Sequence, residues 1–186
     1  MVGYDFDKTI YGGDSTTNFF IYMVLTRPFL ILFLPWFLCV FALYGLKIIG
    51  KKRFKELVFF FVPLYGEKIR KIVKVFWKRN EKKIFKWYRA QKKTSDVIIS
   101  ASLKFIVEPM AEKLGATLIA TEYDVKTGKI IGENCYGDAK RVAFLKRFPE
   151  KKLTAFYSDS MSDFPMMKLA GRGFMVNGEK VWEIKI

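Results

Sequence analysis

Two carboxylates near the start of the chain give the first chemical signal. The short apolar run Val2-Gly3-Tyr4 is followed by Asp5 and Asp7, with one residue between them. Such a run predicts a buried strand, and open α/β sheets place their ligand sites at the carboxyl ends of strands. Two buried like charges repel each other unless a cation shares their site. The pair therefore predicts a divalent metal site in which one carboxylate attacks and the other moves protons.

Taken alone, the same two residues could simply end a strand, but three later stretches favour a functional role. They are an apolar run that ends in a hydroxyl, a lysine at the start of a helix, and an acidic loop: Val97-Ile98-Ile99-Ser100, Gly137-Asp138-Ala139-Lys140 and Tyr157-Ser158-Asp159-Ser160-Met161-Ser162-Asp163. Together with Asp5-Phe6-Asp7-Lys8-Thr9, and in the same order, they resemble the four motifs of the haloacid dehalogenase superfamily of phosphohydrolases.

This resemblance implies a Rossmann-like α/β core and a role for each motif residue. Asp5 would attack phosphorus to give an aspartyl-phosphate, and Asp7 would serve as the acid for the leaving alcohol and then as the base for water. Thr9, Ser100 and Lys140 would bind the oxygens of the transferring phosphoryl group. By themselves, Ser100 could be a strand-end residue and Lys140 a surface charge.

The resemblance also implies Mg2+ as the cofactor. Asp5, the backbone carbonyl of Asp7, and Asp159 would hold the ion, which suits hard oxygen ligands. Asp163 would be a further ligand or an acid that orients the metal site. Lys8 could lie at the mouth of the site or be solvated.

The elements that position these residues follow from the pattern after Thr94. Short apolar runs alternate with helical stretches, which predicts a parallel sheet wrapped by helices. The expected strands are 96–99, 117–120, 153–157, 174–176 and 181–182, with a hairpin that turns at Thr127-Gly128. The expected helices are 103–114 ended by Gly115, one capped by Asp138 that runs through Phe148, and 162–170 ended by Gly171. We assign residues 1–14 and 94–186 to the catalytic core.

Residues 15–93 are then an inserted cap, which resembles the helical cap of the phosphoserine-phosphatase-like subgroup. Asp14, just before it, could contact substrate or cap the first helix.

Nineteen residues from Pro28 to Leu46 carry no charge, and as a helix they would extend about 28 Å, close to the thickness of a bilayer's hydrocarbon core. A single crossing would split one active site across a membrane. We therefore expect a re-entrant or interfacial hairpin over 28–65 that bends at Pro35 or near Tyr44-Gly45, with a buried hairpin in a soluble cap as the alternative.

The segment 66–93 is strongly basic. The segment contains twelve Lys and Arg residues but only two acidic residues, Glu67 and Glu81. Its apolar residues Ile69, Ile72, Val73 and Phe76 follow helical spacing. The pattern predicts a basic amphipathic helix, broken near Asn80, that is attracted to anionic lipid headgroups. The alternative is an ordinary solvated face.

Composition limits the possible partners and chemistry. The formal charge of +15 indicates an anionic partner, which could be nucleic acid, lipid or a phosphorylated substrate. The absence of histidine excludes histidine-based triads and histidine-ligated zinc within this chain. Cys39 and Cys135 show no metal or disulfide spacing and are expected to be reduced, which fits a cytoplasmic location.

These observations predict a Mg2+-dependent phosphomonoesterase whose cap dips into the cytoplasmic leaflet of a membrane. The Tyr157–Ser160 stretch, Cys135-Tyr136-Gly137 with Lys140, and the apolar insertion resemble the membrane-associated phosphatidylglycerophosphatase C branch, which implies a lipid phosphate such as phosphatidylglycerol phosphate as substrate. One alternative is a soluble phosphatase of the phosphoserine type. The other is a basic nucleic-acid-binding module on a phosphatase-like core, which the apolar run disfavours.

Overall fold

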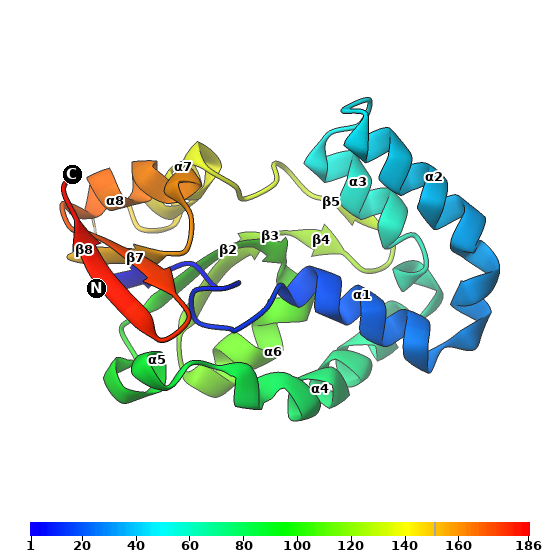
Figure 1. The fold of residues 1–186 in the computed structure, drawn as a ribbon, viewed down its shortest axis with the longest axis horizontal. Coiled ribbons are helices and arrows are strands. Elements are labelled where there is room, and N and C mark those ends of the chain that lie inside the picture. Colours follow the sequence, from blue (N-terminus) through cyan, green and yellow to red (C-terminus); the bar gives the residue numbers. More distant parts are fainter. Residues whose placement is uncertain (151) are drawn as a thin grey trace.

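A six-stranded sheet forms the centre of the computed structural model, which describes residues 1–150 and 152–186 (Figure 1). The strands run in the order β3-β2-β1-β6-β7-β8. They are β1 (Val2–Tyr4), β2 (Val97–Leu103), β3 (Thr117–Thr121), β6 (Ala155–Ser158), β7 (Gly173–Asn177) and β8 (Lys180–Ile184). The expected parallel sheet is confirmed for all strands except β8, which pairs antiparallel with β7 at the edge.

The strand order makes β1 a switch point. From β1 the chain builds β2 and β3 on one side, and it later returns to build β6, β7 and β8 on the other side. Ligand sites of open α/β sheets form at such a point, beyond the carboxyl ends of the strands. The end of β1, where Asp5 follows Tyr4, is therefore the expected place for the site.

Helices cover both faces of the sheet because the strand side chains alternate. Val97 and Ile99 of β2 pack with the α7 and α8 side of the core, whereas Ile98 packs with the α6 side. Figure 1 shows α7 (Asp138–Arg147) and α8 (Phe164–Ala170) on one face and α6 (Lys104–Leu114) on the other. Gly115 and Gly171 end α6 and α8 in the left-handed conformation, as predicted.

Two local predictions in the core have different outcomes. The hairpin of β4 (Tyr123–Asp124) and β5 (Lys129–Ile130) turns beside Gly128, as expected. The prediction that Asp138 caps α7 is wrong by one residue, because Gly137 occupies the N-cap position. Asp138 instead lies in the first turn, where its carboxylate accepts a hydrogen bond from Arg141 at 2.6 Å and lies near the positive end of the helix dipole.

The segment between β1 and β2 is helical. It contains α1 (Ser15–Thr26), a 3-10 helix (Pro28–Phe33), α2 (Leu34–Gly45), α3 (Lys51–Val58), 3-10 turns at Val62–Leu64 and Gly66–Lys68, α4 (Ile69–Asn80), a 3-10 turn at Glu81–Lys83, and α5 (Lys86–Gln91). Asp14 caps α1 through its side chain, which accepts a hydrogen bond from the Thr17 amide at 2.7 Å. We call this helical segment the cap.

The apolar part of the cap forms a helical hairpin. α2 packs against α3, and the chain turns between them over residues 46–50, beside Tyr44-Gly45. Pro35 lies in the first turn of α2, where a proline is tolerated because its missing N–H would have no helical partner. In Figure 1 the hairpin lies at the end of the molecule farthest from β8.

The basic segment packs differently from a free amphipathic helix. It breaks at Asn80, where α4 ends, and continues as a 3-10 turn and the short α5. Ile69, Val73, Phe76 and Trp77 are buried, and the indole N–H of Trp77 donates to the Ile106 carbonyl of α6 at 2.6 Å. The apolar side of the segment is thus part of the protein's own core, while all twelve of its Lys and Arg residues are exposed.

Candidate active site

The carboxyl ends of β1 and β6 bring the first and last motifs together. Tyr4 and Tyr157 are partners in the parallel register, and the Asp5 amide donates to the Tyr157 carbonyl at 2.9 Å. Asp159 lies just beyond the end of β6. The sheet therefore places Asp5 and Asp159 side by side although 154 positions separate them in the sequence.

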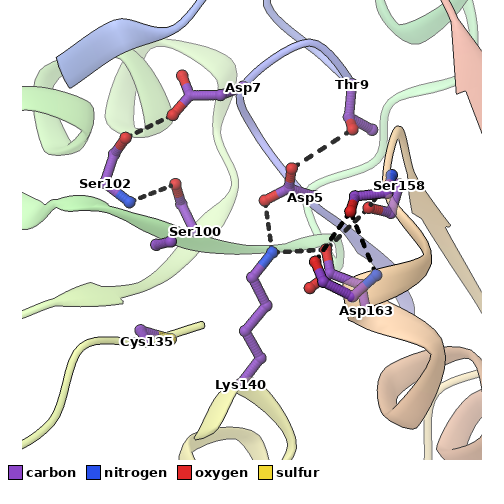
Figure 2. A network of polar contacts seen from close by, with 12 residues as sticks. Asp5, Asp7, Thr9, Ser100, Ser102, Cys135, Lys140, Ser158 and Asp163 are labelled. Carbon is purple, nitrogen blue, oxygen red and sulfur yellow. Dashed lines mark hydrogen bonds and ion pairs between the residues drawn. The ribbon is translucent and has the colours of Figure 1, made fainter. Parts of the chain in front are cut away.

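Lys140 lies beside Asp5 at the centre of this arrangement. Figure 2 shows its amine between two carboxylates: Nζ donates to Asp5 Oδ1 at 2.6 Å and to Asp163 Oδ2 at 2.7 Å. The Ser158 hydroxyl donates to the same Asp163 oxygen at 2.8 Å. Burial alone would lower the pKa of Lys140, but Asp5 and Asp163 outweigh burial and raise it. The structure thus holds a permanent cation next to Asp5, and Asp163 positions that cation.

Asp7 points away from Asp5 toward the cap. Its carboxylate accepts a hydrogen bond from the Ser15 amide at 2.7 Å and another from the Ser102 hydroxyl. Burial, with the nearby charge of Asp14, raises the pKa of Asp7 to about 6. A carboxyl group with a pKa near neutrality can both give and take a proton, which is what general acid–base catalysis requires.

Thr9 and Ser100 are both buried, and both hydroxyls have protein partners. Thr9 Oγ1 accepts from the Asp159 amide at 2.9 Å and lies 3.5 Å from both Asp5 Oδ2 and Asp159 Oδ1. Ser100 Oγ accepts from the Ser102 amide at 3.1 Å. Thr9 therefore links the loop after β1 to the loop after β6 by a hydrogen bond. Phosphate binding by Thr9 and Ser100 stays a prediction.

Ser102 is a residue that the motif analysis missed. Its hydroxyl donates to Asp7 and accepts from the hydroxyls of Ser15 at 3.1 Å and Thr16 at 2.8 Å. The strand was expected to end at Ile99, but β2 runs to Leu103 with an irregular register after Ser100. The spacing Ser100-Ala101-Ser102 was the available signal, because alternate residues of a strand share a face.

The oxygen atoms near Asp5 fit a magnesium ion. In the described part of the chain, no three carboxylates or thiols converge into a ready cage, but Mg2+ commonly takes one or two carboxylates and completes its shell with water and phosphate oxygens. Asp5 Oδ2 and Asp159 Oδ1 approach the same Thr9 hydroxyl. The Asp163 Oδ1 atom is buried without a hydrogen-bond partner. Burial raises the pKa of Asp5 to about 7 and raises that of Asp159, which a nearby divalent cation would reverse.

A cavity of about 350 Å3 joins these groups to the cap. Asp5, Asp7 and Asp159 line one part of it. Its wall on the cap side includes apolar, aromatic and basic side chains of α1, α2, α3 and the residue after α3: Phe20, Phe41, Tyr44, Lys51, Phe54, Lys55, Val58 and Phe59. Two of the three lysines of α3, Lys51 and Lys55, line the cavity, and sequence analysis did not distinguish them from the many surface lysines.

Known proteins resemble this chain in sequence and in fold. The family model for haloacid dehalogenase-like hydrolases matches residues 2–168. A probable phosphatase of Mycobacterium tuberculosis is 39% identical over 93 residues, which cover 45% of this chain and only 32% of that protein.

Two solved structures share the fold. A protein of unknown function from Bordetella pertussis superposes with a TM-score of 0.77 at 17% identity, over 93% of this chain and 87% of that one. A haloacid dehalogenase family hydrolase from Salmonella enterica serovar Typhi superposes with a TM-score of 0.60 at 11% identity, over 91% and 60% of the two chains.

Proposed function

We propose that this chain, which belongs to the haloacid dehalogenase-like hydrolase family, is a Mg2+-dependent phosphomonoesterase that acts on a phosphorylated lipid at the cytoplasmic face of a membrane. The observation that carries the proposal is the shape of the site. A single cavity connects the carboxylates after β1 to aromatic side chains of α1, α2 and α3. Such a cavity suits a substrate with a phosphate at one end and an apolar body at the other.

The chemistry follows from the two aspartates. The Asp5 carboxylate attacks phosphorus and forms an aspartyl-phosphate while the bond from phosphorus to the ester oxygen breaks. Asp7 gives its proton to the departing alkoxide. Asp7, now ionised, then takes a proton from a water molecule that attacks the same phosphorus, which releases inorganic phosphate and restores Asp5.

Lys140 places a positive charge beside the phosphoryl group, and a bound metal would add to that charge. Lys140 is held by Asp5 and Asp163, so its ammonium needs no rearrangement to face the phosphoryl oxygens. Asp5, Asp159 and the carbonyl of Asp7 would hold Mg2+, which when bound supplies positive charge against the phosphoryl oxygens. Ser102 orients Asp7 for its two proton transfers.

The outer surface of the cap supports a membrane location. Residues 28–45 have a mean hydropathy of 2.1, and only 17% of them are buried in the protein. A helix of a soluble core would be mostly buried, whereas this one exposes Leu32, Trp36 and Leu38 to solvent. Because Asp5 precedes this segment and Asp159 follows it, the segment must enter and leave a bilayer on the same side.

The same helix α2 contributes to both surfaces. Phe41 and Tyr44 line the cavity, while Trp36 and Leu38 are exposed. A lipid substrate could therefore present its headgroup to the cavity while its chains stay in the bilayer. The exposed cations of 66–93 would add attraction to anionic headgroups, about 1 kcal/mol for each one near the surface.

The test is a phosphate-release screen with Mg2+, in the presence and absence of anionic vesicles. Phosphorylated lipids should be hydrolysed at the vesicle surface with higher kcat/KM than phosphoserine or other soluble phosphomonoesters. Efficient hydrolysis of small phosphomonoesters without vesicles, together with no activity on lipids, would favour the soluble phosphoserine type of enzyme. No phosphate release from any substrate would refute the phosphatase itself.

A further inference from the structure

We infer that Lys55 of α3 is a positioning residue for the proton transfers proposed for Asp7. It holds the Ala101 carbonyl, which fixes the neighbouring Ser102, whose hydroxyl orients Asp7. The inference rests on the proposed phosphatase function and adds a residue of the cap to its acid–base step. Lys55 needs no contact with the substrate for this role.

β2 is irregular where it reaches the site. Its register with β3 shifts between Ser100 and Leu103, which pair with consecutive residues of β3. Ala101 and Ser102 lie between them and take no part in that ladder. Such bulges redirect side chains next to active sites. The backbone inside the bulge must then be held by groups other than the neighbouring strand.

Three hydrogen bonds hold the peptide group between Ala101 and Ser102. Its carbonyl oxygen accepts from Lys55 Nζ and from the Thr121 hydroxyl, each at 2.7 Å. Its N–H donates to Ser100 Oγ at 3.1 Å. Because a peptide group is planar, bonds at both of its ends fix the whole plane. That plane sets the direction in which the Ser102 side chain leaves the backbone.

The Ser102 hydroxyl connects this peptide group to Asp7 (Figure 2). It donates to the Asp7 carboxylate and accepts from the hydroxyls of Ser15 at 3.1 Å and Thr16 at 2.8 Å. A hydroxyl has one proton and two lone pairs, so every part of this one has a partner. A shift of the Ser102 backbone would therefore change the direction of the bond that orients Asp7.

Lys55 projects from the cap onto this part of the core. Its Nζ also donates to the Asn134 side-chain oxygen at 2.6 Å, so the amine bonds to two separate segments of the core. Burial lowers the pKa of Lys55 to about 8, and the charges of Asp14 and Asp7 oppose that change. The amine thus stays protonated at neutral pH, and hydrogen bonds from a charged donor are the stronger ones.

The direction of the proton donor then depends on a helix of the cap, which gives the inference a distinct signature. A lysine that only stabilised the fold would affect the hydrolysis of every phosphomonoester alike. A lysine that positions Asp7 affects mainly those esters whose leaving group needs a proton, because general acid catalysis matters only for them.

The test compares leaving groups in two pairs of substrates. Benzyl phosphate and p-nitrophenyl phosphate form a soluble pair of similar size. A long-chain alkyl phosphate and a nitrophenyl phosphate with the same chain, both in detergent micelles, form an amphiphilic pair. For each variant the measured quantity is the ratio of kcat/KM for the ester of the alcohol to kcat/KM for the nitrophenyl ester. A general loss of binding or of folded enzyme cancels in this ratio.

Lys55→Met should lower the ratio about tenfold or more, which is part of the roughly 100-fold or more that a general acid contributes. Ser102→Ala should lower it as well, and the double variant should lose little more than Ser102→Ala alone, because both act through one bond to Asp7. The matched control is Lys52→Met on the same helix, whose amine donates to the Gly132 carbonyl and does not line the cavity. Its ratio should equal that of the wild type.

A second variant perturbs the same carbonyl from the core. Thr121→Val removes the other hydroxyl donor to Ala101 and should lower the ratio, whereas Thr121→Ser keeps a hydroxyl and should preserve it. This pair of variants decides the question if Lys55→Met fails to fold.

The inference is overturned if folded Lys55→Met keeps the wild-type ratio, or if Thr121→Val keeps it. It is also overturned if Lys52→Met lowers the ratio equally, because any loosening of the cap would then suffice. In each of these cases the wild type still releases phosphate, so the phosphatase function stands. A wild type that hydrolyses neither pair of substrates refutes both.

Discussion

Four exposed side chains of the cap give the most direct test of membrane binding. Leu32, Leu38, Leu46 and Ile48 are 81%, 62%, 71% and 65% exposed. The perturbation is the simultaneous replacement of all four by glutamine. Because these side chains contact little of the protein, the variant should fold with nearly unchanged stability, as exposed surface substitutions usually do.

The expected loss of membrane affinity follows from the exposed fractions. Full burial of a leucine or isoleucine side chain contributes about 1.5–3 kcal/mol. Scaled by the exposed fractions, each side chain would contribute about 1–2 kcal/mol in lipid, and the four together about 4–8 kcal/mol. The affinity for vesicles should therefore fall by about three orders of magnitude or more, since about 1.4 kcal/mol is tenfold.

The assay is flotation with anionic vesicles at low and high salt. The wild type should float under both conditions, because salt screens the attraction of the basic segment but leaves the apolar contribution intact. The glutamine variant should stay at the bottom at high salt. As a matched control, Ile131→Gln with Val142→Gln removes apolar side chains that are 62% and 55% exposed on the core, and this variant should float like the wild type.

The reasoning is refuted if the wild type does not float, or if the glutamine variant floats as well as the wild type at high salt. In the first case the hairpin is a cap surface of a soluble enzyme. Thermal unfolding guards against a trivial result: a variant that unfolds at a much lower temperature than the wild type would show that the four side chains stabilise the protein itself.

Three further predictions concern the catalytic groups. Asp5→Asn should abolish turnover and formation of the aspartyl-phosphate, as detected by trapping with radiolabelled substrate, while circular dichroism stays the same; near-normal turnover would exclude Asp5 as the nucleophile. Asp159→Ala should weaken Mg2+ binding about tenfold or more, the effect of losing a charged ligand, in calorimetry as well as in activity titrations, and identical titrations would place the metal elsewhere. Asp7→Asn should lower kcat about 100-fold or more on alkyl phosphates, the usual value of general acid catalysis. With p-nitrophenyl phosphate the rate of phosphoryl transfer to Asp5 should fall less, because the leaving group needs no proton. Equal losses of that rate with both substrates would contradict the role of Asp7 as the acid.

The sequence was sufficient to predict the residues that strand ends bring together. Asp5 and Asp159 each follow a short apolar run, and parallel strands of one sheet end at the same edge. Lys140 could be added because its motif begins a helix in the expected order. The helix ends at Gly115 and Gly171 were also predictable, because a left-handed residue that ends a helix is usually glycine.

Features that depend on packing were not predictable from residue order. Lys55 is one of 33 basic residues, and nothing in the sequence distinguishes it until α3 packs against Ala101 and Asn134. The partner of the Thr9 hydroxyl lies 150 positions away at Asp159, which no local pattern encodes. The helical spacing of apolar residues on α4 was visible in the sequence, but the packing of that side against α6 emerged only from the fold.

The joint between α4 and α6 has a kinetic consequence. Trp77 bonds to the Ile106 carbonyl inside a continuous cluster of buried side chains that includes Phe76 of the cap and Ile98 of the core sheet. Lifting the cap as a rigid lid would expose this cluster to water, at a cost of several kcal/mol for two aromatic side chains alone. Substrate must therefore reach the cavity along the α2–α3 side of the cap, while the α4–α6 contact between cap and core stays closed. A rigid-body opening of the whole cap would then not be the step that limits product release.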